Sequence, residues 1–131
     1  MKSEEADHQK AVIEWAAWHE KKWPCLKFLY ACPNEGKHKV QYRVHQKAMG
    51  VKSGVPDLFL PYPIARPPEK REYGWVEPFH GLYIEMKAGK NKPTKNQQDW
   101  IKYLSEAGYR VEVCWSCDEA IAVIKSYLKE V

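Results

Sequence analysis

The sequence predicts one α/β domain in which helices flank a small mixed β-sheet. Short apolar runs bounded by turn residues alternate with longer segments of helical periodicity. At 131 residues and 44% hydrophobic content, residues 1–131 suit a single packed domain. Nine prolines argue against a helical bundle, because they indicate long irregular connections.

The N-terminal part predicts a helix followed by a strand. The first 22 residues contain few helix breakers and precede Pro24, which favours a helix. Residues 25–31, CLKFLYA, predict the first strand, and the turn signal PNEG at 33–36 closes it. Residues 37–50 are polar and basic, and both a helix and an ordered loop fit them.

Two strands with a long connection between them are predicted in the middle of the chain. Residues 55–61, VPDLFLP, form the second strand, and residues 81–87, GLYIEMK, form the third. The connection over 61–80 carries five prolines, and its length indicates a functional or flexible segment. Tyr73 and Trp75 in this connection would stack on an unpaired base, or pack the loop against the body or a second subunit.

The C-terminal part predicts a helix, a strand and a second helix. Residues 92–108 form the first helix with Thr94 as its N-cap, and residues 109–115, YRVEVCW, form the fourth strand. Ser116 and Glu119 have the capping-box spacing that opens the last helix. The inner faces of these helices are expected to carry Trp100, Ile101 and Leu104 in the first, and Ile121, Ile124 and Leu128 in the second.

The formal net charge of +4 is unevenly distributed. Residues 37–52 contain five Lys or Arg and no acid, and residues 86–96 contain four Lys and no acid. Clustered positive charge suits the phosphate backbone of a nucleic acid, and two solvated basic loops are the alternative. No segment approaches the ~18 uninterrupted apolar residues of a membrane span, and the N-terminus lacks a signal-peptide pattern. We therefore expect a soluble intracellular protein with no membrane partner.

Four cysteines raise the alternative of a zinc-stabilised adaptor. They are Cys25, Cys32, Cys114 and Cys117, and the last two form a C-x-x-C pair of the kind found in zinc sites. Cys25 and Cys114 lie in apolar runs, where burial as small hydrophobic residues explains them equally well.

Three charged residues stand at the ends of neighbouring predicted strands. Asp57 begins one strand, and Glu85 and Lys87 end the next, where alternation places both on one face and Met86 on the other. If these strands are adjacent, two carboxylates meet, and they repel unless a divalent cation neutralises them. Their hard oxygen atoms favour Mg²⁺ or Mn²⁺, and a nearby lysine can help to activate water. A surface ion pair is the alternative.

The motifs around these residues resemble the PD-(D/E)XK nuclease superfamily. Pro56–Asp57 within GVPDLFLP and Glu85 to Lys87 within IEMKAG match its two motif halves. With the later segment PTKNQQDWIKYLSEAGYRVEVC, the chain resembles more narrowly the VRR-NUC (virus-type replication-repair nuclease) family in its stand-alone phage and bacterial form. The similarity runs from Glu5 to about Leu128. It implies a restriction-endonuclease-like core.

The family places an acidic residue in the first helix, and helical geometry distinguishes the candidates. With Val12 at zero and about 100° per residue, the inward face centres near 20°. Glu5 falls at about 20°, Glu4 at about 280° and Glu14 at about 200°. Glu5 is therefore predicted to point inward, although a first-turn acid also stabilises the positive helix terminus.

The resemblance also implies roles for individual residues. The implied metal ligands for Mg²⁺ or Mn²⁺ are Glu5, Asp57, Glu85 and the backbone carbonyl of Met86. Lys87 would position and activate water, with help from Gln97, whose amide also matches a capping box with Thr94. The predicted phosphate-binding residues, near a helix N-terminus, are Lys90, Lys92 and Lys95.

From these features we expect a metal-dependent nuclease that hydrolyses phosphodiester bonds in DNA. Stand-alone members of the family resemble Holliday-junction resolvases and work as homodimers, which favours branched DNA as substrate and a role in DNA repair. The expected location is the cytoplasm of a bacterium or a phage-infected cell. A monomer that nicks flaps or single strands, and a catalytically silent nucleic-acid-binding module, are the alternatives.

Overall fold

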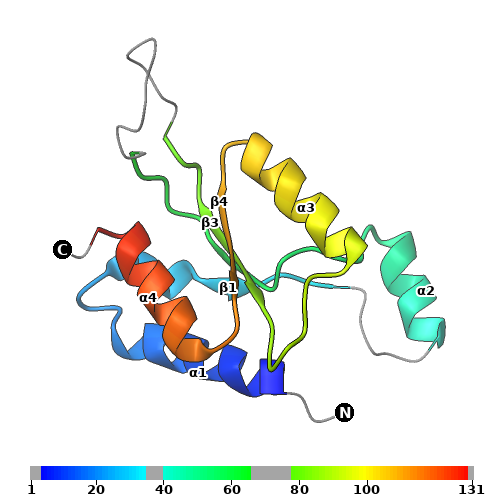
Figure 1. Cartoon of the computed structure of the whole chain (residues 1–131), viewed down its shortest axis with the longest axis horizontal. Helices are drawn as coiled ribbons and strands as arrows, with labels where there is room; N and C mark the ends of the chain where they lie inside the picture. The colour runs from blue at the N-terminus through cyan, green and yellow to red at the C-terminus, as the bar shows by residue number, and fades with distance from the viewer. Residues whose placement is uncertain (1–3, 35–39, 66–77, 130–131) are drawn as a thin grey trace.

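A computed structural model describes residues 4–34, 40–65 and 78–129. In this part of the chain, one sheet in the order β1-β2-β3-β4 separates helices α1 and α4 on one side from α3 on the other (Figure 1). The helices are α1 (Glu4–Trp18), α2 (Val40–Ala48), α3 (Lys95–Glu106) and α4 (Cys117–Tyr127), with a 3-10 helix η1 (Pro24–Phe28). The strands are β1 (Tyr30–Ala31), β2 (Leu58–Leu60), β3 (Leu82–Met86) and β4 (Arg110–Cys114).

The sheet is mixed, as the sequence predicts. β1 pairs with β2, and β2 with β3, in antiparallel fashion, whereas β3 and β4 are parallel and are joined by a crossover through α3. A parallel pair needs such a crossover, because its two strands run in the same direction. The carboxyl end of β3 and the first turn of α3 thereby belong to one short connection.

The two faces of the sheet differ in what covers them. The register pairs Leu58 with Ile84 and Phe59 with Tyr83, so these pairs point to opposite faces. α1 and α4 cover the face of Leu58, whereas α3 packs against β4. The main core consists of Val12, Ala16, Ala120, Ile124 and Tyr127 from the helices and Leu58, Leu60, Leu82, Ile84, Met86 and Cys114 from the strands.

The predicted strand at 25–31 is wrong for most of its length. Pro24 to Phe28 form the 3-10 helix η1, and β1 retains only Tyr30 and Ala31. Proline favours the first turn of a helix, since its φ is fixed and its missing N–H is not needed there. Leu26 and Leu29, three residues apart, are both buried, which is the spacing that a 3-10 turn places on one side.

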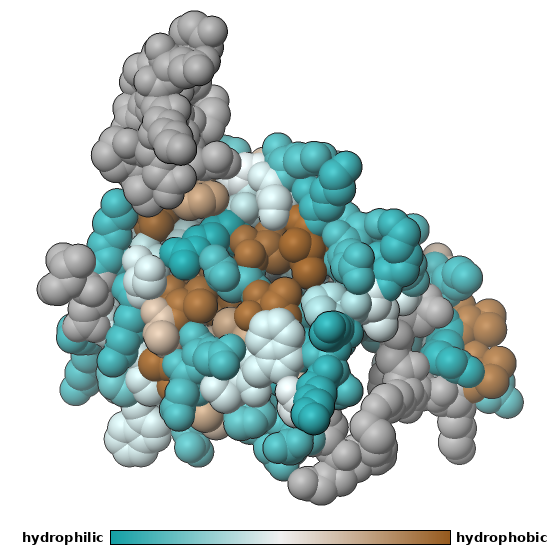
Figure 2. Space-filling view, in the orientation of Figure 1, coloured by the Kyte–Doolittle hydropathy of each residue, from teal (hydrophilic) through white to brown (hydrophobic). Residues whose placement is uncertain are grey.

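The N-terminal helix is shorter than predicted, and the basic segment that follows β1 contains a helix. α1 ends at Trp18, and the His19 ring nitrogen contacts the Trp15 carbonyl at 2.7 Å. Of the two alternatives for 37–50, the structure has the helix α2, none of whose residues is buried. Its apolar side chains Val40 and Val44 are each 63% exposed, and apolar atoms stand out on this part of the surface (Figure 2).

The two ends of the long connection after β2 pair with each other through an antiparallel bridge. Ile64 and Phe79 exchange two backbone hydrogen bonds of 3.1 and 2.8 Å, which extends the β2–β3 pair beyond the named strands. The segment 66–77, with the stacking candidates Tyr73 and Trp75, lies outside the described residues. Across the ranges that the structure describes, no helix is long and apolar enough to span a bilayer.

One of the two predicted capping boxes is complete. Thr94 Oγ1 accepts from the Gln97 N–H at 3.3 Å, and Gln97 Oε1 accepts from the Thr94 N–H at 2.8 Å. At α4, Ser116 Oγ accepts from the Glu119 N–H, but the Glu119 carboxylate reaches one residue further back, to the Trp115 N–H. On the inner faces, Leu104 and Ile124 are buried as predicted, whereas Trp100, Ile101, Ile121 and Leu128 are half-buried.

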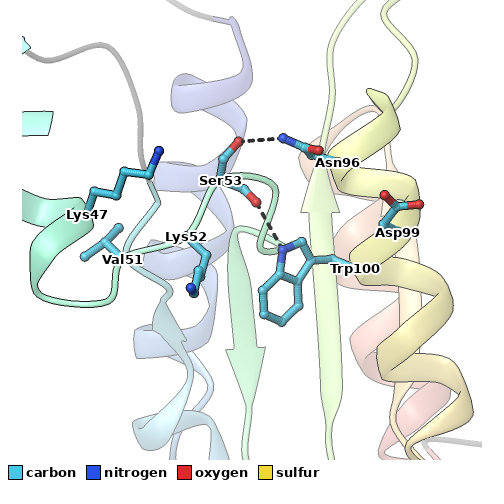
Figure 3. A pocket seen from close by; sticks show the side chains of 7 residues that line it. All are labelled: Lys47, Val51, Lys52, Ser53, Asn96, Asp99 and Trp100. Atoms are coloured by element: carbon cyan, nitrogen blue, oxygen red, sulfur yellow. Dashed lines mark hydrogen bonds between the residues drawn. The ribbon is translucent and has the colours of Figure 1, made fainter. Parts of the chain in front are cut away.

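The loop before β2 is held tightly against the first turn of α3. The Trp100 indole N–H donates to the Ser53 carbonyl at 3.0 Å, and the Asn96 side chain donates to Ser53 Oγ at 3.2 Å (Figure 3). Gly54 has φ +91°, and a Cβ there would lie 2.8 Å from the Asn96 carbonyl carbon. This contact explains the glycine in GVPD: it lets the loop approach α3 closely and so sets where Asp57 begins β2.

Replacing Gly54 with alanine should therefore lower the free energy of unfolding more than the same change at Gly50. Gly50 has a similar φ of +96°, but a Cβ added there would meet no atom within 4 Å. Gly50→Ala therefore costs only the energy of placing alanine in the left-handed conformation, about 1–2 kcal/mol. Gly54→Ala adds a clash with backbone, and we expect a further loss of at least about 1 kcal/mol. Urea unfolding measures both, and equal losses would contradict close packing at Gly54.

Candidate active site

The pairing of β2 with β3 brings together the three charged residues predicted for the site, Asp57, Glu85 and Lys87. Asp57 directly precedes β2, Glu85 lies in β3, and Lys87 directly follows β3. Because Leu58 pairs with Ile84 in antiparallel register, Asp57 lies beside the end of β3. Its Oδ2 accepts a hydrogen bond of 2.7 Å from the Met86 N–H. The expectation that these strands are neighbours is confirmed.

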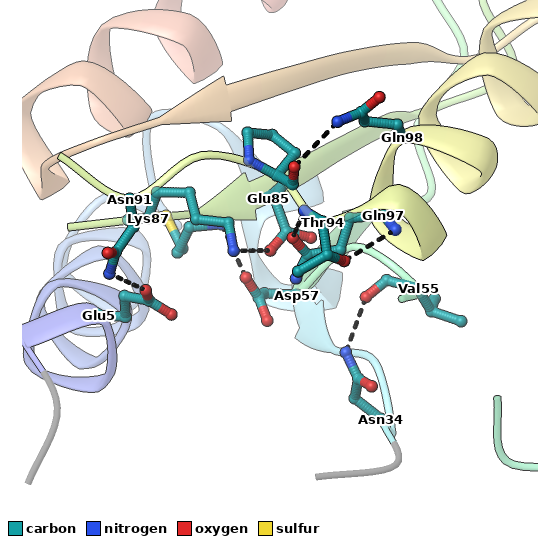
Figure 4. A network of polar contacts seen from close by, with 12 residues as sticks. Glu5, Asn34, Val55, Asp57, Glu85, Lys87, Asn91, Thr94, Gln97 and Gln98 are labelled. Carbon is teal, nitrogen blue, oxygen red and sulfur yellow. Dashed lines mark hydrogen bonds and ion pairs between the residues drawn. The ribbon is translucent and has the colours of Figure 1, made fainter. Parts of the chain in front are cut away.

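The charged groups at this point are buried. Glu85 is 2% exposed and Lys87 is 6% exposed, and Lys87 Nζ lies 4.0 Å from Glu85 Oε2 (Figure 4). Such burial excludes a surface ion pair at the strand ends. A buried ion pair seldom stabilises a fold, since the loss of hydration offsets the attraction between the charges. The placement of these groups therefore points to chemistry.

The Glu85 carboxylate lacks part of the bonding that a buried charge needs. Its Oε1 has no hydrogen-bond partner among the described residues. Burial, and next the charge of Asp57, raise the pKa of the Glu85 carboxyl to about 9, while Lys87 opposes the rise. Burial also raises the pKa of Asp57, against the effect of the Met86 N–H. Without a cation, the pair therefore tends to hold a proton, and an oxygen atom remains for another ligand.

Glu5 approaches this pair from the first turn of α1. It is half-buried, whereas Glu4 and Glu14 are exposed, as the helical geometry predicts. Its negative charge makes a smaller contribution than burial to the raised pKa of both Asp57 and Glu85. Glu5 is thus the acidic side chain of α1 nearest in effect to the pair, but it does not converge with Asp57 and Glu85 into a three-carboxylate group.

Asn91 holds the Glu5 carboxylate and was not predicted from the sequence. Its side-chain amide donates to Glu5 Oε2 at 3.3 Å (Figure 4). Its backbone carbonyl accepts from the Trp115 indole N–H at 2.7 Å. The loop between β3 and α3 thus links α1 to the end of β4. A second link joins α1 to α4, where His8 Nδ1 accepts from the Cys117 N–H at 3.1 Å. The sequence offers no signal for Asn91 beyond its place among the lysines of 86–96.

The remaining predicted residues surround the first turn of α3. Gln97 is half-buried and uses its amide oxygen for the capping bond to Thr94, which leaves the amide nitrogen for a further interaction. Lys90 and Lys92 are exposed. Lys95 is also exposed, but its ammonium lies 2.6 Å from the Asp99 carboxylate, which partly neutralises its charge. Phosphate binding by these lysines stays a prediction.

The cysteines do not form a zinc site. All four are free thiols, and Cys114 is fully buried in the core. Within residues 4–34, 40–65 and 78–129, no three side chains of His, Cys, Asp and Glu converge closely enough to hold a metal ion by themselves. The same observation means that Asp57 and Glu85 provide a two-carboxylate site, which backbone carbonyls or an approach of Glu5 would have to complete.

Comparison with known proteins identifies the family. The sequence profile of the VRR-NUC domain matches residues 3–118. The chain belongs to the VRR-NUC family. A solved structure described as a VRR_NUC domain protein superposes with a TM-score of 0.71 at 29% identity, covering 98% of this chain and 91% of that one. Proteins of curated function include none that matches the sequence.

This membership confirms the restriction-endonuclease-like fold expected from the motifs. A VRR-NUC domain has a nuclease-type function, and a nuclease binds nucleic acid. In this chain, the charged cluster at the end of β3 lies on a mixed sheet flanked by helices.

The raised pKa of Glu85 makes a prediction for the metal-free VRR-NUC domain. Folding raises the pKa of the Glu85 carboxyl from its usual 4.5 to about 9. The free energy of unfolding of the protein therefore falls as the pH rises through this range, because the unfolded chain releases the proton first. Glu85→Gln removes this titration, so its unfolding free energy in EDTA should exceed that of the wild type by a margin that grows over this range to at least about 1 kcal/mol.

Urea unfolding in EDTA at several pH values measures this margin. Glu14→Gln, at an exposed position on α1, is the matched control and should track the wild type. A margin for Glu85→Gln that is constant with pH would contradict a raised carboxyl pKa.

Proposed function

We propose that this VRR-NUC domain is a metal-dependent nuclease that hydrolyses phosphodiester bonds in DNA at Asp57, Glu85 and Lys87. One observation carries the proposal: the buried Glu85 Oε1 has no partner among the described residues, and a second half-buried carboxylate stands beside it. Hard oxygen donors with excess negative charge fit Mg²⁺ or Mn²⁺.

Asp57 and Glu85 would hold the cation, with Glu5 and the Met86 carbonyl as further ligands. The N–H and C=O of one residue in a strand point to the same side, and the Met86 N–H points to Asp57. The Met86 carbonyl therefore faces the same edge of β3. A cation bound there would stabilise the charge of the phosphate transition state and lower the pKa of a water molecule.

Lys87 would act on the water or on a phosphate oxygen. Its ammonium is buried beside Glu85, so it has few positions available and stays directed at the site. Gln97 would donate from its amide nitrogen to the same water or phosphate. Lys90, Lys92 and Lys95 would contact phosphates next to the cut, where their charge adds to the positive terminus of α3.

For the substrate and assembly, we propose junction-type branched DNA and a homodimer in which two sites cut two strands. The exposed apolar side chains Val40 and Val44 on α2 provide surface that a second copy would cover. A repair role in a bacterial or phage-infected cytoplasm fits such a substrate. Light scattering on the purified protein separates the homodimer from a monomer that nicks flaps or single strands.

Cleavage of labelled duplex, flap, single-stranded and four-way-junction DNA tests the proposed activity. With Mg²⁺ or Mn²⁺ the wild type should cut, and EDTA should abolish cutting. Asp57→Asn and Lys87→Met should each lower the rate by at least about 100-fold, because they remove a cation ligand and a group that acts in the transition state. Glu14→Gln should retain full activity.

Two outcomes would reject the nuclease assignment. The first is a wild type that binds DNA but cuts none of these substrates with either cation, as a catalytically silent module would. The second is equal cutting by the wild type and both active-site variants.

Asn91 should affect cation affinity through Glu5. Asn91→Ala removes a hydrogen bond worth about 0.5–1.5 kcal/mol, so the Mn²⁺ dissociation constant should rise by about 2- to 10-fold. Calorimetric titration with Mn²⁺ measures this change without cleavage. In a Glu5→Ala background, Asn91→Ala should have no further effect, since the carboxylate that it positions is gone. Additive losses would contradict a role for Asn91 through Glu5.

A further inference from the structure

The aromatic side chains of Tyr30, Phe59 and Tyr83 form a strip on the sheet face that carries the candidate active site. Phe59 lies two residues after Asp57, and Tyr83 lies two residues before Glu85, so alternation places each pair on one face. The register pairs Phe59 with both Tyr83 and Tyr30. Since a strand rises about 3.3 Å per residue, Phe59 and Tyr83 each lie about 7 Å along their strand from the neighbouring carboxylate residue.

The rings of this strip are held in fixed positions. The Phe59 and Tyr83 rings stack with centroids 4.2 Å apart and planes 27° apart, and the Tyr30 ring stands edge-on to Phe59 at 5.9 Å. Tyr109, the residue directly before β4, contacts the Phe59 and Tyr83 rings edge-on, with centroids 5.8 and 5.2 Å away. A ligand would therefore meet a surface that is already ordered, which reduces the entropy lost on binding.

The strip remains partly exposed. Tyr30 is 49% exposed, and Phe59, Tyr83 and Tyr109 are half-buried. α3 lies on this side of the sheet but packs against β4, at the other end of the sheet from β1. Single exposed aromatic residues are common on protein surfaces, but contacting rings in a row form a patch of the kind that binds ligands.

The charges around the strip favour a polyanion with flat apolar groups. Glu85 is the only acidic residue within β1, β2 and β3. Lys90 follows β3 near the candidate active site. Lys47 and Lys52, together with Asp99, line a pocket of about 460 Å³ beside Ser53, in the loop that leads to Asp57 (Figure 3). Positive charge along a backbone path, together with aromatic rings, is the combination that binds single-stranded nucleic acid.

We propose that Tyr30, Phe59 and Tyr83 form a stacking subsite for an unpaired nucleobase next to the phosphate that is cut. The inference rests on the proposed nuclease function and specifies its substrate. In an intact duplex each base is stacked between its neighbours and paired, so it is not free to lie on these rings. The preferred substrate is therefore DNA that is locally single-stranded at the cut, as at a flap, a gap or an open junction.

Binding of labelled single-stranded DNA, followed by fluorescence anisotropy with Ca²⁺ in place of Mg²⁺, tests this subsite without cleavage. Stacking contributes about 1–3 kcal/mol per base, so Phe59→Leu and Tyr83→Leu should each weaken binding by about 5- to 100-fold. Tyr83→Phe retains the ring and should bind like the wild type. Phe28→Leu, at an aromatic residue that is 61% exposed in η1, is the matched control and should change nothing.

An oligonucleotide with one abasic nucleotide provides the decisive comparison, because it keeps the phosphate and lacks the base. At one position along the strand, the abasic nucleotide should weaken wild-type binding as much as Phe59→Leu does. The variant should then show no further loss on that oligonucleotide. Circular dichroism confirms that each variant is folded, and the loss of wild-type binding on the abasic oligonucleotide keeps the test valid if a leucine variant does not fold.

Several results would overturn the proposal. They are undiminished binding by folded Phe59→Leu, equal loss on intact duplex, or a change of oligomeric state in place of a change in affinity, which would make the strip a contact between copies. The subsite and the nuclease function fail separately. Base-dependent binding without cleavage would reject the nuclease function and support the subsite. Metal-dependent cleavage at the same rate in Phe59→Leu and the wild type would support the nuclease function and reject the subsite.

Discussion

The approach of the half-buried Asp57 carboxyl group to the buried Glu85 carboxyl group is the constraint on which the rest of this site depends. Bringing them together disfavours their charged forms and leaves one oxygen of Glu85 without a partner among the described residues. The Met86 N–H and the Lys87 ammonium offset part of this cost. A protein that gained nothing from the arrangement would be more stable with apolar residues there. The arrangement therefore lowers stability, which is the cost expected of the cation and phosphate site that we propose here.

Most of the structural detail around the pair serves to fix it in place. Gly54 allows the loop before β2 to lie against α3, and Asp57 at the end of that loop accepts a hydrogen bond from the Met86 N–H. On the opposite side, Asn91 ties Glu5 to the loop after β3, and the Trp115 indole ties that loop to β4. The fold thus brings side chains from distant parts of the sequence to the end of one strand. Under the proposed nuclease function, these contacts would orient the catalytic groups before the phosphate arrives.

The sequence predicted where the charged residues of the candidate site lie better than it predicted the details of the fold. Glu85 and Lys87 share a face because alternation in a strand is a local property, and Glu5 points inward because a helical repeat is also local. Residues 25–31 were predicted wrongly because apolar composition does not distinguish a strand from a 3-10 turn with two buried leucines. Glu119 completes its cap one residue earlier than the pattern indicates, since a glutamate side chain reaches either N–H.

By itself the sequence determined the class of the fold, the family and the three charged residues at the strand ends. These depend on periodicity and on motifs, both of which are properties of short segments. Only the tertiary structure decided that Asp57 and Glu85 are neighbours, that Glu85 and Lys87 are buried, and that Asn91 holds Glu5. It also placed the ring of Phe59 against that of Tyr83 on the same face as the site. Burial and contact between residues far apart in the chain depend on which strands pair and which helices cover them, and no local pattern specifies those choices.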